Sequence, residues 1–159
     1  MKEIEKKYLV NGDIDLTKYE KIEVEQGYLN TSLPIIRIRK YGDEYFITYK
    51  SKIKSNKDIN IANEYELPLS EEAYYNLRGK IDNNLISKDR YLVPLKDGRV
   101  AQLDVFHDRL EGLRIVEVEF CSLKASLNFK KPSWFGEEIT GNKKYFNSNL
   151  SKANSLKEI

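Results

Sequence analysis

Charged side chains placed two residues apart are the feature of this sequence with the clearest chemical potential. Residues i and i+2 of a strand point to the same side, so Glu3, Glu5 and Lys7 would lie side by side on one face. The pattern recurs in five later segments, each time with two charges of one sign: Arg37 and Arg39, Lys50 and Lys52, Glu64 and Glu66, Lys88 and Arg90, Glu117 and Glu119. Six segments with such pairs indicate a site for a multiply charged ligand.

The inventory of these positions is balanced between acids and bases. Once Asp104 is included, the set contains seven acids and seven bases. Carboxylate oxygens are the ligands that hard divalent cations prefer, whereas Arg and Lys bind phosphate oxygens. Both kinds of group needed to hold a complex of a divalent metal with a polyphosphate are therefore present.

The direction in which the charges face decides between two interpretations. In the segment 114–120, Glu117 and Glu119 share one face and Val116, Val118 and Phe120 share the other. The simplest interpretation buries the apolar face and solvates the charged one. A solvated face, however, usually mixes signs, because adjacent like charges repel. Charges that converge inside a barrel cost much desolvation, so such an interior is better explained by ligand binding than by stability. A barrel with exposed charges and an apolar ligand cavity is the alternative.

Alternating segments predict the elements that position these charges. We expect strands at about 2–10, 22–29, 34–40, 44–52, 61–68, 85–94, 99–107 and 114–121. Turn residues at Gly42-Asp43 and Lys96-Asp97-Gly98 predict that 34–52 and 85–107 are antiparallel hairpins. Residues 53–60 form a polar loop in this scheme.

A few helices complete the prediction. Ser70 before Glu71 predicts a capped helix that ends near Gly79, and short helices are expected at 122–128 and 142–150. The fold class is mainly β (α+β): an eight-stranded antiparallel β-barrel tunnel with a few short helices packed outside. Residues 1–150 form this one domain, and residues 151–159 form a polar C-terminal tail that frays.

Composition excludes several classes of protein. With 40% hydrophobic and 33% charged residues in 159, the chain is typical of a globular domain. A net charge of +2 gives no reason to expect nucleic-acid binding. One cysteine and one histidine exclude an internal disulfide and a zinc site built on thiolates or imidazoles, so any metal must be held by carboxylates. No apolar run approaches the roughly 20 residues of a membrane span, and a soluble cytoplasmic protein without membrane contact is expected.

The ordered motifs resemble the CYTH superfamily, also called triphosphate tunnel metalloenzymes, and in particular its small bacterial inorganic triphosphatases. The resemblance covers almost the whole chain. It is carried by Glu3-Ile-Glu5-Lys-Lys7, Arg37-Ile-Arg39, Thr48-Tyr-Lys50, Glu64-Tyr-Glu66, Lys88-Asp-Arg90, Leu103-Asp104-Val and Glu117-Val-Glu119, and by the C-terminal stretches Trp134–Thr140 and Lys144–Asn147.

The resemblance implies a role for each matched residue. Glu3, Glu5 and Glu119 would hold a catalytic Mg²⁺ or Mn²⁺, and Glu117 would complete that site or help bind a second ion. A second ion or the attacking water would be held by Glu64, Glu66 and Asp104. The phosphate chain would be bound by Lys7, Arg37, Arg39, Lys50, Lys88 and Arg90, with Lys52 as a less certain match. The catalytic set would be Glu5, Lys7, Asp104 and Glu119.

The resemblance also implies an activity. The expected reaction is metal-dependent hydrolysis of inorganic triphosphate to pyrophosphate and phosphate inside the tunnel. A nucleoside or thiamine triphosphatase, an adenylate cyclase and a non-catalytic polyphosphate-binding module are the alternatives. The sequence allows a homodimer without requiring one.

Overall fold

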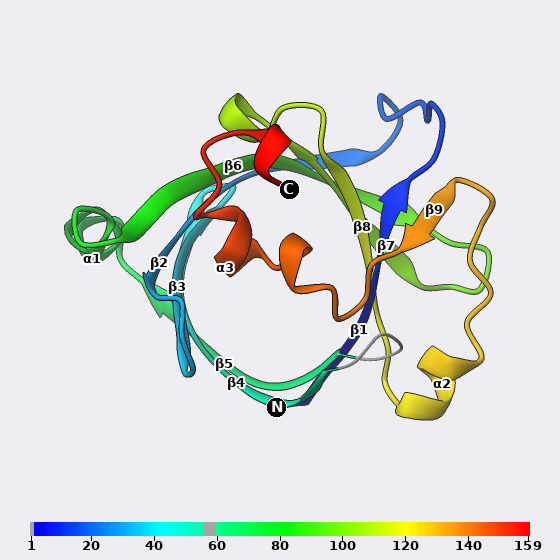
Figure 1. Cartoon of the computed structure of the whole chain (residues 1–159), viewed down its shortest axis with the longest axis horizontal. Coiled ribbons are helices and arrows are strands. Elements are labelled where there is room, and N and C mark those ends of the chain that lie inside the picture. Colours follow the sequence, from blue (N-terminus) through cyan, green and yellow to red (C-terminus); the bar gives the residue numbers. More distant parts are fainter. Residues whose placement is uncertain (1, 56–59) are drawn as a thin grey trace.

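Eight antiparallel strands close into a barrel, which Figure 1 shows from one open end. The computed structural model describes residues 2–55 and 60–159. The strands are β1 (Lys2–Val10), β2 (Glu20–Asn30), β3 (Ile35–Tyr41), β4 (Glu44–Ser55), β5 (Asn60–Leu69), β6 (Asp82–Pro94), β7 (Val100–Phe106) and β8 (Arg114–Glu119). They pair in the order β5-β4-β3-β2-β6-β7-β8-β1, and β5 also pairs with β1, which closes the ring. The predicted eight-stranded antiparallel barrel with short helices is confirmed, but not every helix packs outside it, because α3 (Asn147–Leu150) lies within the ring (Figure 1).

The two predicted hairpins form as expected. Tyr41 pairs with Glu44 across Gly42, whose φ of 59° lies in the region that glycine adopts without steric cost. Pro94 pairs with Val100, and Gly98 (φ 87°) makes that turn. At the expected loop 53–60, β4 continues to Ser55 and β5 begins at Asn60. The rest of that loop, 56–59, lies outside the described residues.

Apolar side chains cover the outside of β1, β7 and β8. Tyr8, Leu103 and Val116 are buried there in one cluster with Phe135. The cover comes from a ninth strand, β9 (Phe135–Glu138), which pairs with the end of β1, and from the segment around α2 (Leu123–Leu127). Figure 1 shows both elements outside the ring. Because side chains alternate along a strand, the charged positions of these strands must face inward.

A second apolar cluster fills part of the barrel interior. It contains Tyr28, Phe106, Ile115 and Leu150. Leu150 belongs to α3 (Asn147–Leu150), which lies within the outline of the ring in Figure 1, together with the 3-10 turn Lys143–Tyr145. The C-terminal segment therefore packs against the barrel interior.

The last nine residues do not fray as the sequence suggested. Ser151 and Ala153 are buried, and the Asn84 amide donates to the Ser151 carbonyl at 3.0 Å. The Arg109 guanidinium donates to the Leu150 carbonyl at 3.2 Å, to the Leu85 carbonyl at 2.7 Å and also to the Ala153 carbonyl. These bonds join the segment to β6 and to the 3-10 turn Asp108–Leu110.

Helix α1 (Glu71–Arg78) packs outside β3 and β4. Its Ser70 cap accepts from the Ala73 amide at 3.1 Å. Tyr74 is buried and its hydroxyl donates to Glu25 at 2.8 Å, while Arg78 Nε donates to the same carboxylate at 2.7 Å. These bonds hold the helix on the barrel wall. Within the described parts of the chain, no helix has the length and apolar character needed to span a membrane.

Candidate active site

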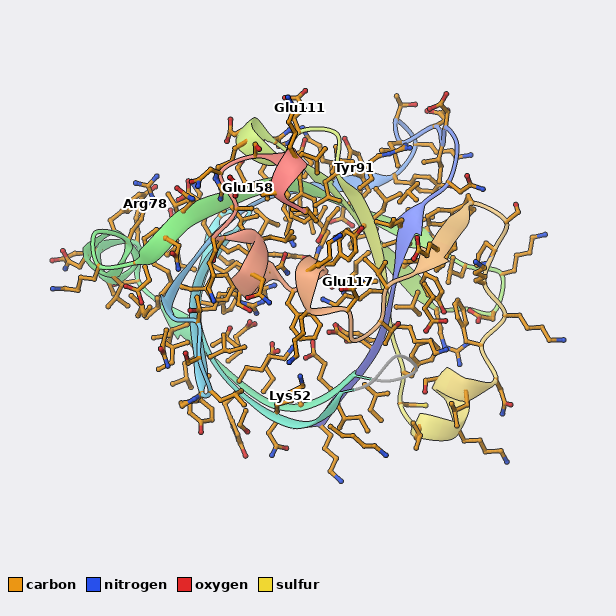
Figure 2. All side chains as sticks on the ribbon, in the orientation of Figure 1. Lys52, Arg78, Tyr91, Glu111, Glu117 and Glu158 are labelled. Carbon is orange, nitrogen blue, oxygen red and sulfur yellow. The ribbon has the colours of Figure 1, made fainter. Side chains whose placement is uncertain are left out.

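The barrel encloses a cavity of about 460 Å³. Side chains of six strands fill the ring with charge, and Glu117 and Lys52 can be followed in Figure 2 as they project into it. Eleven of the fourteen predicted site residues line this cavity: Glu3, Glu5, Lys7, Arg37, Arg39, Lys50, Lys52, Glu64, Arg90, Glu117 and Glu119. The interpretation that the charges converge inside the barrel is therefore correct, and the alternative with exposed charges and an apolar cavity is wrong.

Two neighbouring arginines of β3 carry hydrogen-bond donors without partners. The Nε atoms of Arg37 and Arg39 are buried and have no hydrogen-bond acceptor among the described residues. Burial and the charges of Arg37 and Arg90 lower the pKa of Arg39 to about 10. A buried unsatisfied donor is costly, and so is repulsion between like charges. Both costs would be relieved by an anion in the cavity.

Carboxylates of β5 partly compensate the cations of β3 and β4. Glu66 accepts from Arg39 Nη2 at 2.8 Å and from Thr48 Oγ1 at 3.2 Å. Glu64 lies 3.6 Å from Arg37 Nη2 and 3.4 Å from Lys50 Nζ. These contacts orient the cations toward the cavity. Glu66 itself does not line the cavity.

Acidic side chains gather where β1 meets β8. Glu5 pairs in register with Glu119, and Lys7 with Glu117. Lys7 Nζ lies 3.4 Å from Glu5 and 3.0 Å from Glu117, and Lys50 Nζ contacts Glu3. Among the carboxyl, imidazole and thiol groups that the structure describes, no three are close enough to enclose a metal ion. The acids are instead paired mainly with lysines.

The pKa values of two neighbouring glutamates of β8 are shifted in opposite directions. Burial and the charges of Glu3, Glu5 and Glu117 raise the pKa of Glu119. Although burial alone would raise it, Lys7, Arg90 and Lys88 hold the pKa of Glu117 well below its usual range. Glu117 therefore serves as a counter-ion for these cations. Glu119 instead lies among carboxylates whose negative charge is not fully balanced.

Asp104 and Lys88 lie behind the cavity wall instead of lining it. Both side chains are about 1% exposed, and Lys88 Nζ lies 2.5 Å from Asp104. Arg90 donates to the same carboxylate from Nε at 2.7 Å and from Nη2 at 2.8 Å. Despite burial, Arg90 and Lys88 hold the pKa of Asp104 below its usual range. In this arrangement Lys88 and Asp104 position Arg90, which does line the cavity.

Several lining residues were not predicted from the sequence. Gln102 accepts from Arg90 Nη1 at 2.5 Å, and its position two residues before Asp104 could have revealed it. Tyr28 also lines the cavity, but it is uncharged and so was not part of the charge pattern used for the prediction. Lys143 and the residues Phe146–Asn149 also line the cavity. Because they belong to turns and a short helix without strand periodicity, only the tertiary fold brings them there.

Similarity to known proteins decides the family. No family model matches the sequence. The chain is 38% identical over 153 residues to the inorganic triphosphatase of Nitrosomonas europaea, and the match covers 95% of this chain and 97% of that protein. The chain belongs to the inorganic triphosphatase family. The member of this family from Acetivibrio thermocellus is 36% identical over 152 residues, which cover 95% of this chain and 94% of that protein.

A solved structure agrees with this assignment to the inorganic triphosphatase family. A crystal structure of an inorganic triphosphatase superposes with a TM-score of 0.70 at 36% identity, covering 96% of each chain. The resemblance that the ordered charge motifs predicted is confirmed.

Proposed function

We propose that this protein hydrolyses inorganic triphosphate to pyrophosphate and phosphate in its barrel cavity, with the help of a divalent metal ion. The observation that carries the proposal is the pair of buried, unpartnered Nε donors of Arg37 and Arg39. They lie in a cavity that Lys7, Lys50 and Arg90 also line. Relatives named inorganic triphosphatases at 36–38% identity supply the substrate.

In this proposal the phosphate chain is bound and oriented by five of the cavity-lining cations: Lys7, Arg37, Arg39, Lys50 and Arg90. Arg37 and Arg39 offer planar donor groups that match phosphate oxygens in pairs. Arg90 is fixed by Asp104 and Gln102, so it loses little side-chain entropy when substrate binds. Lys88 is assigned a positioning role through Asp104, because its ammonium group lies behind the wall.

The acidic side chains of β1 and β8 are of the type that binds a divalent cation, although they would have to move closer together to hold it, since no three of the described acidic groups lie close enough in this structure. They are Glu3, Glu5, Glu117 and Glu119, and their oxygens are hard ligands of the kind that Mg²⁺ and Mn²⁺ bind. The raised pKa of Glu119, caused by burial and by the other three glutamates, is the sign of a site that lacks positive charge. We assign Glu3, Glu5 and Glu119 as metal ligands, with Glu117 shared between the metal and Lys7. A bound divalent ion would supply electrostatic activation of the terminal phosphoryl group.

The reaction itself is a displacement at the terminal phosphorus. Water forms the new P–O bond, the bridging P–O bond breaks, and pyrophosphate leaves with both electrons of that bond. Charge develops on the equatorial and bridging oxygens in such transition states, so catalysis consists mainly of positioning and charge neutralisation. Lys7, Arg37 and Arg39 supply the positive charge that neutralises these oxygens, from groups whose positions are already fixed. No nucleophilic side chain is needed.

Phosphate release tests the proposal. We expect fast release from inorganic triphosphate with Mg²⁺ or Mn²⁺, slower release from ATP and long-chain polyphosphate, and none with EDTA. Glu119→Gln is expected to lower kcat at least about 100-fold, in the range seen when a group that stabilises the transition state is removed. Glu137→Gln, an exposed glutamate on β9, is the matched control. Absence of release from every substrate with both metals would refute the proposal.

Two further predictions concern the protein as a whole. The sequence allows a homodimer without requiring one, and the cytoplasmic location stays a prediction from the sequence. Light scattering of the purified protein would measure the mass in solution and so test the first. Fractionation of cells that express the tagged chain would test the second.

A further inference from the structure

Two lysines at the opening of the cavity differ from all the cations deeper inside. Lys52 and Lys143 both line the cavity and both are exposed. Among the side chains that the structure describes, neither has a carboxylate within 4.0 Å, whereas Lys7, Lys50, Arg37, Arg39 and Arg90 each have at least one. The inner cations are therefore charge-compensated and the outer two are not.

Lys52 and Lys143 line the same cavity, although they come from different elements. Lys52 belongs to β4, and its Nζ lies 5.2 Å from the centroid of the Phe146 ring. Lys143 belongs to the turn that precedes Phe146. Burial and the charge of Lys143 lower the pKa of Lys52, as expected where two cations lie within electrostatic reach of each other.

We infer that Lys52 and Lys143 form an outer phosphate subsite, which binds the phosphoryl group that projects beyond the inner cations in chains longer than triphosphate. This inference rests on the proposed function, because it extends the same site by one phosphoryl unit. Asn147, which also lines the cavity, offers an amide donor to the same group, whereas the Asn149 amide already donates to the Lys143 carbonyl at 2.7 Å. The subsite determines chain-length preference and takes no part in the chemical step.

Comparison of triphosphate with tetraphosphate tests this inference. Each exposed charge pair contributes up to about fivefold in affinity. Because Lys52 and Lys143 would share one phosphoryl group, their contributions are coupled and the double variant measures their joint effect. The double variant Lys52→Gln/Lys143→Gln is therefore expected to lose about five- to tenfold in kcat/KM for tetraphosphate. Its kcat/KM for triphosphate should fall by a clearly smaller factor, because the inner cations hold most of that shorter chain. The loss should be smaller at high salt, because exposed charges are screened.

The control makes the same charge change elsewhere. Lys124→Gln/Lys130→Gln removes two exposed lysines that do not line the cavity, and it should leave both substrates unaffected. An equal loss for triphosphate and tetraphosphate in the Lys52/Lys143 variant, or no loss for either, would overturn the inference. A loss confined to ATP would also overturn it and would assign the two lysines to nucleotide binding.

A binding measurement separates this inference from the proposed function. Titration calorimetry in EDTA measures the affinities for triphosphate and tetraphosphate without turnover. Tighter binding of tetraphosphate by the wild type, lost in the double variant, would support the outer subsite even if no phosphate were ever released. Equal affinities of wild type and double variant for tetraphosphate would overturn it whatever the hydrolysis assay gives.

Discussion

Arg90 and Asp104 form a bidentate ion pair on neighbouring strands β6 and β7, with N–O distances of 2.7 and 2.8 Å. Lys88 approaches the same carboxylate at 2.5 Å. One buried anion thus holds two buried cations. Removing one member of a buried ion pair leaves an uncompensated charge, which usually costs about 3–5 kcal/mol.

The first prediction follows from that pair. Asp104→Asn should lower the free energy of unfolding by about 3 kcal/mol, because Arg90 and Lys88 lose their shared counter-ion. Urea denaturation would measure the loss. Asp97→Asn, which breaks an exposed pair with Arg99, is the control and should be nearly neutral. A stable Asp104→Asn protein with normal Mn²⁺ affinity but no turnover would instead favour a direct role for Asp104 in catalysis.

The second prediction separates binding from stability at Arg39. Arg39→Gln removes a buried donor that has no acceptor at Nε and relieves repulsion with Arg37 and Arg90. We expect kcat/KM for triphosphate to fall about 10- to 100-fold, the value of a charge-assisted hydrogen bond, while the thermal midpoint stays the same or rises. Steady-state kinetics and calorimetry on one preparation would measure both. A large drop in the midpoint would contradict this account.

The third prediction concerns stabilisation by the anion alone. In EDTA, triphosphate should raise the thermal midpoint of the wild type, because a ligand at 100 times its Kd stabilises the folded state by about 2.7 kcal/mol. Arg39→Gln should show a much smaller rise at the same concentration. Equal amounts of sulfate at matched ionic strength control for non-specific salt effects. A midpoint that is insensitive to triphosphate would argue against a preformed phosphate site.

The fourth prediction is a pH dependence. The pKa of Glu119 is raised by burial and by the charges of Glu3, Glu5 and Glu117, so this carboxyl takes up a proton at higher pH than an ordinary glutamate. Metal binding needs the ionised form. Mn²⁺ affinity should therefore fall steeply from about pH 8 to about pH 5, beginning above the usual pKa of roughly 4.3. Electron paramagnetic resonance would measure free Mn²⁺; a flat profile would count against clustered glutamate ligands.

Strand periodicity was enough to predict the barrel and most of its cavity lining. The two-residue repeat fixes which side chains share a face, so the spacing of Arg37 and Arg39 is sufficient to place them together. The same repeat cannot show whether a side chain reaches the cavity or stops behind it. Lys88 shares a face with Arg90, yet it is held behind the wall by Asp104, because pairing between charges depends on tertiary distances.

The C-terminal region shows where local pattern fails. Residues 151–159 are polar in sequence, but Arg109 binds backbone carbonyls of Leu150 and Ala153 from more than forty residues away. Backbone carbonyls leave no trace in a sequence, so such bonds cannot be predicted from side-chain type. Strand β9 was not predicted either. Its four residues are too few to show a clear alternation, and they pair only with the end of β1, far away in the sequence.

The closure of the barrel also sets an order of events during synthesis. Lys7 of strand β1 donates a hydrogen bond to Glu117 of β8, which follows it by 110 positions in the sequence. Until β8 has been synthesised, β1 lacks the strand that pairs with its second edge and Lys7 lacks its contact to Glu117, and pairing across such a sequence separation is slow. The charged side chains that alternate along β1 disfavour pairing of its exposed edge with other chains. The residues of β1 that are assigned to metal and phosphate binding would thus also limit aggregation of this strand before β8 is synthesised.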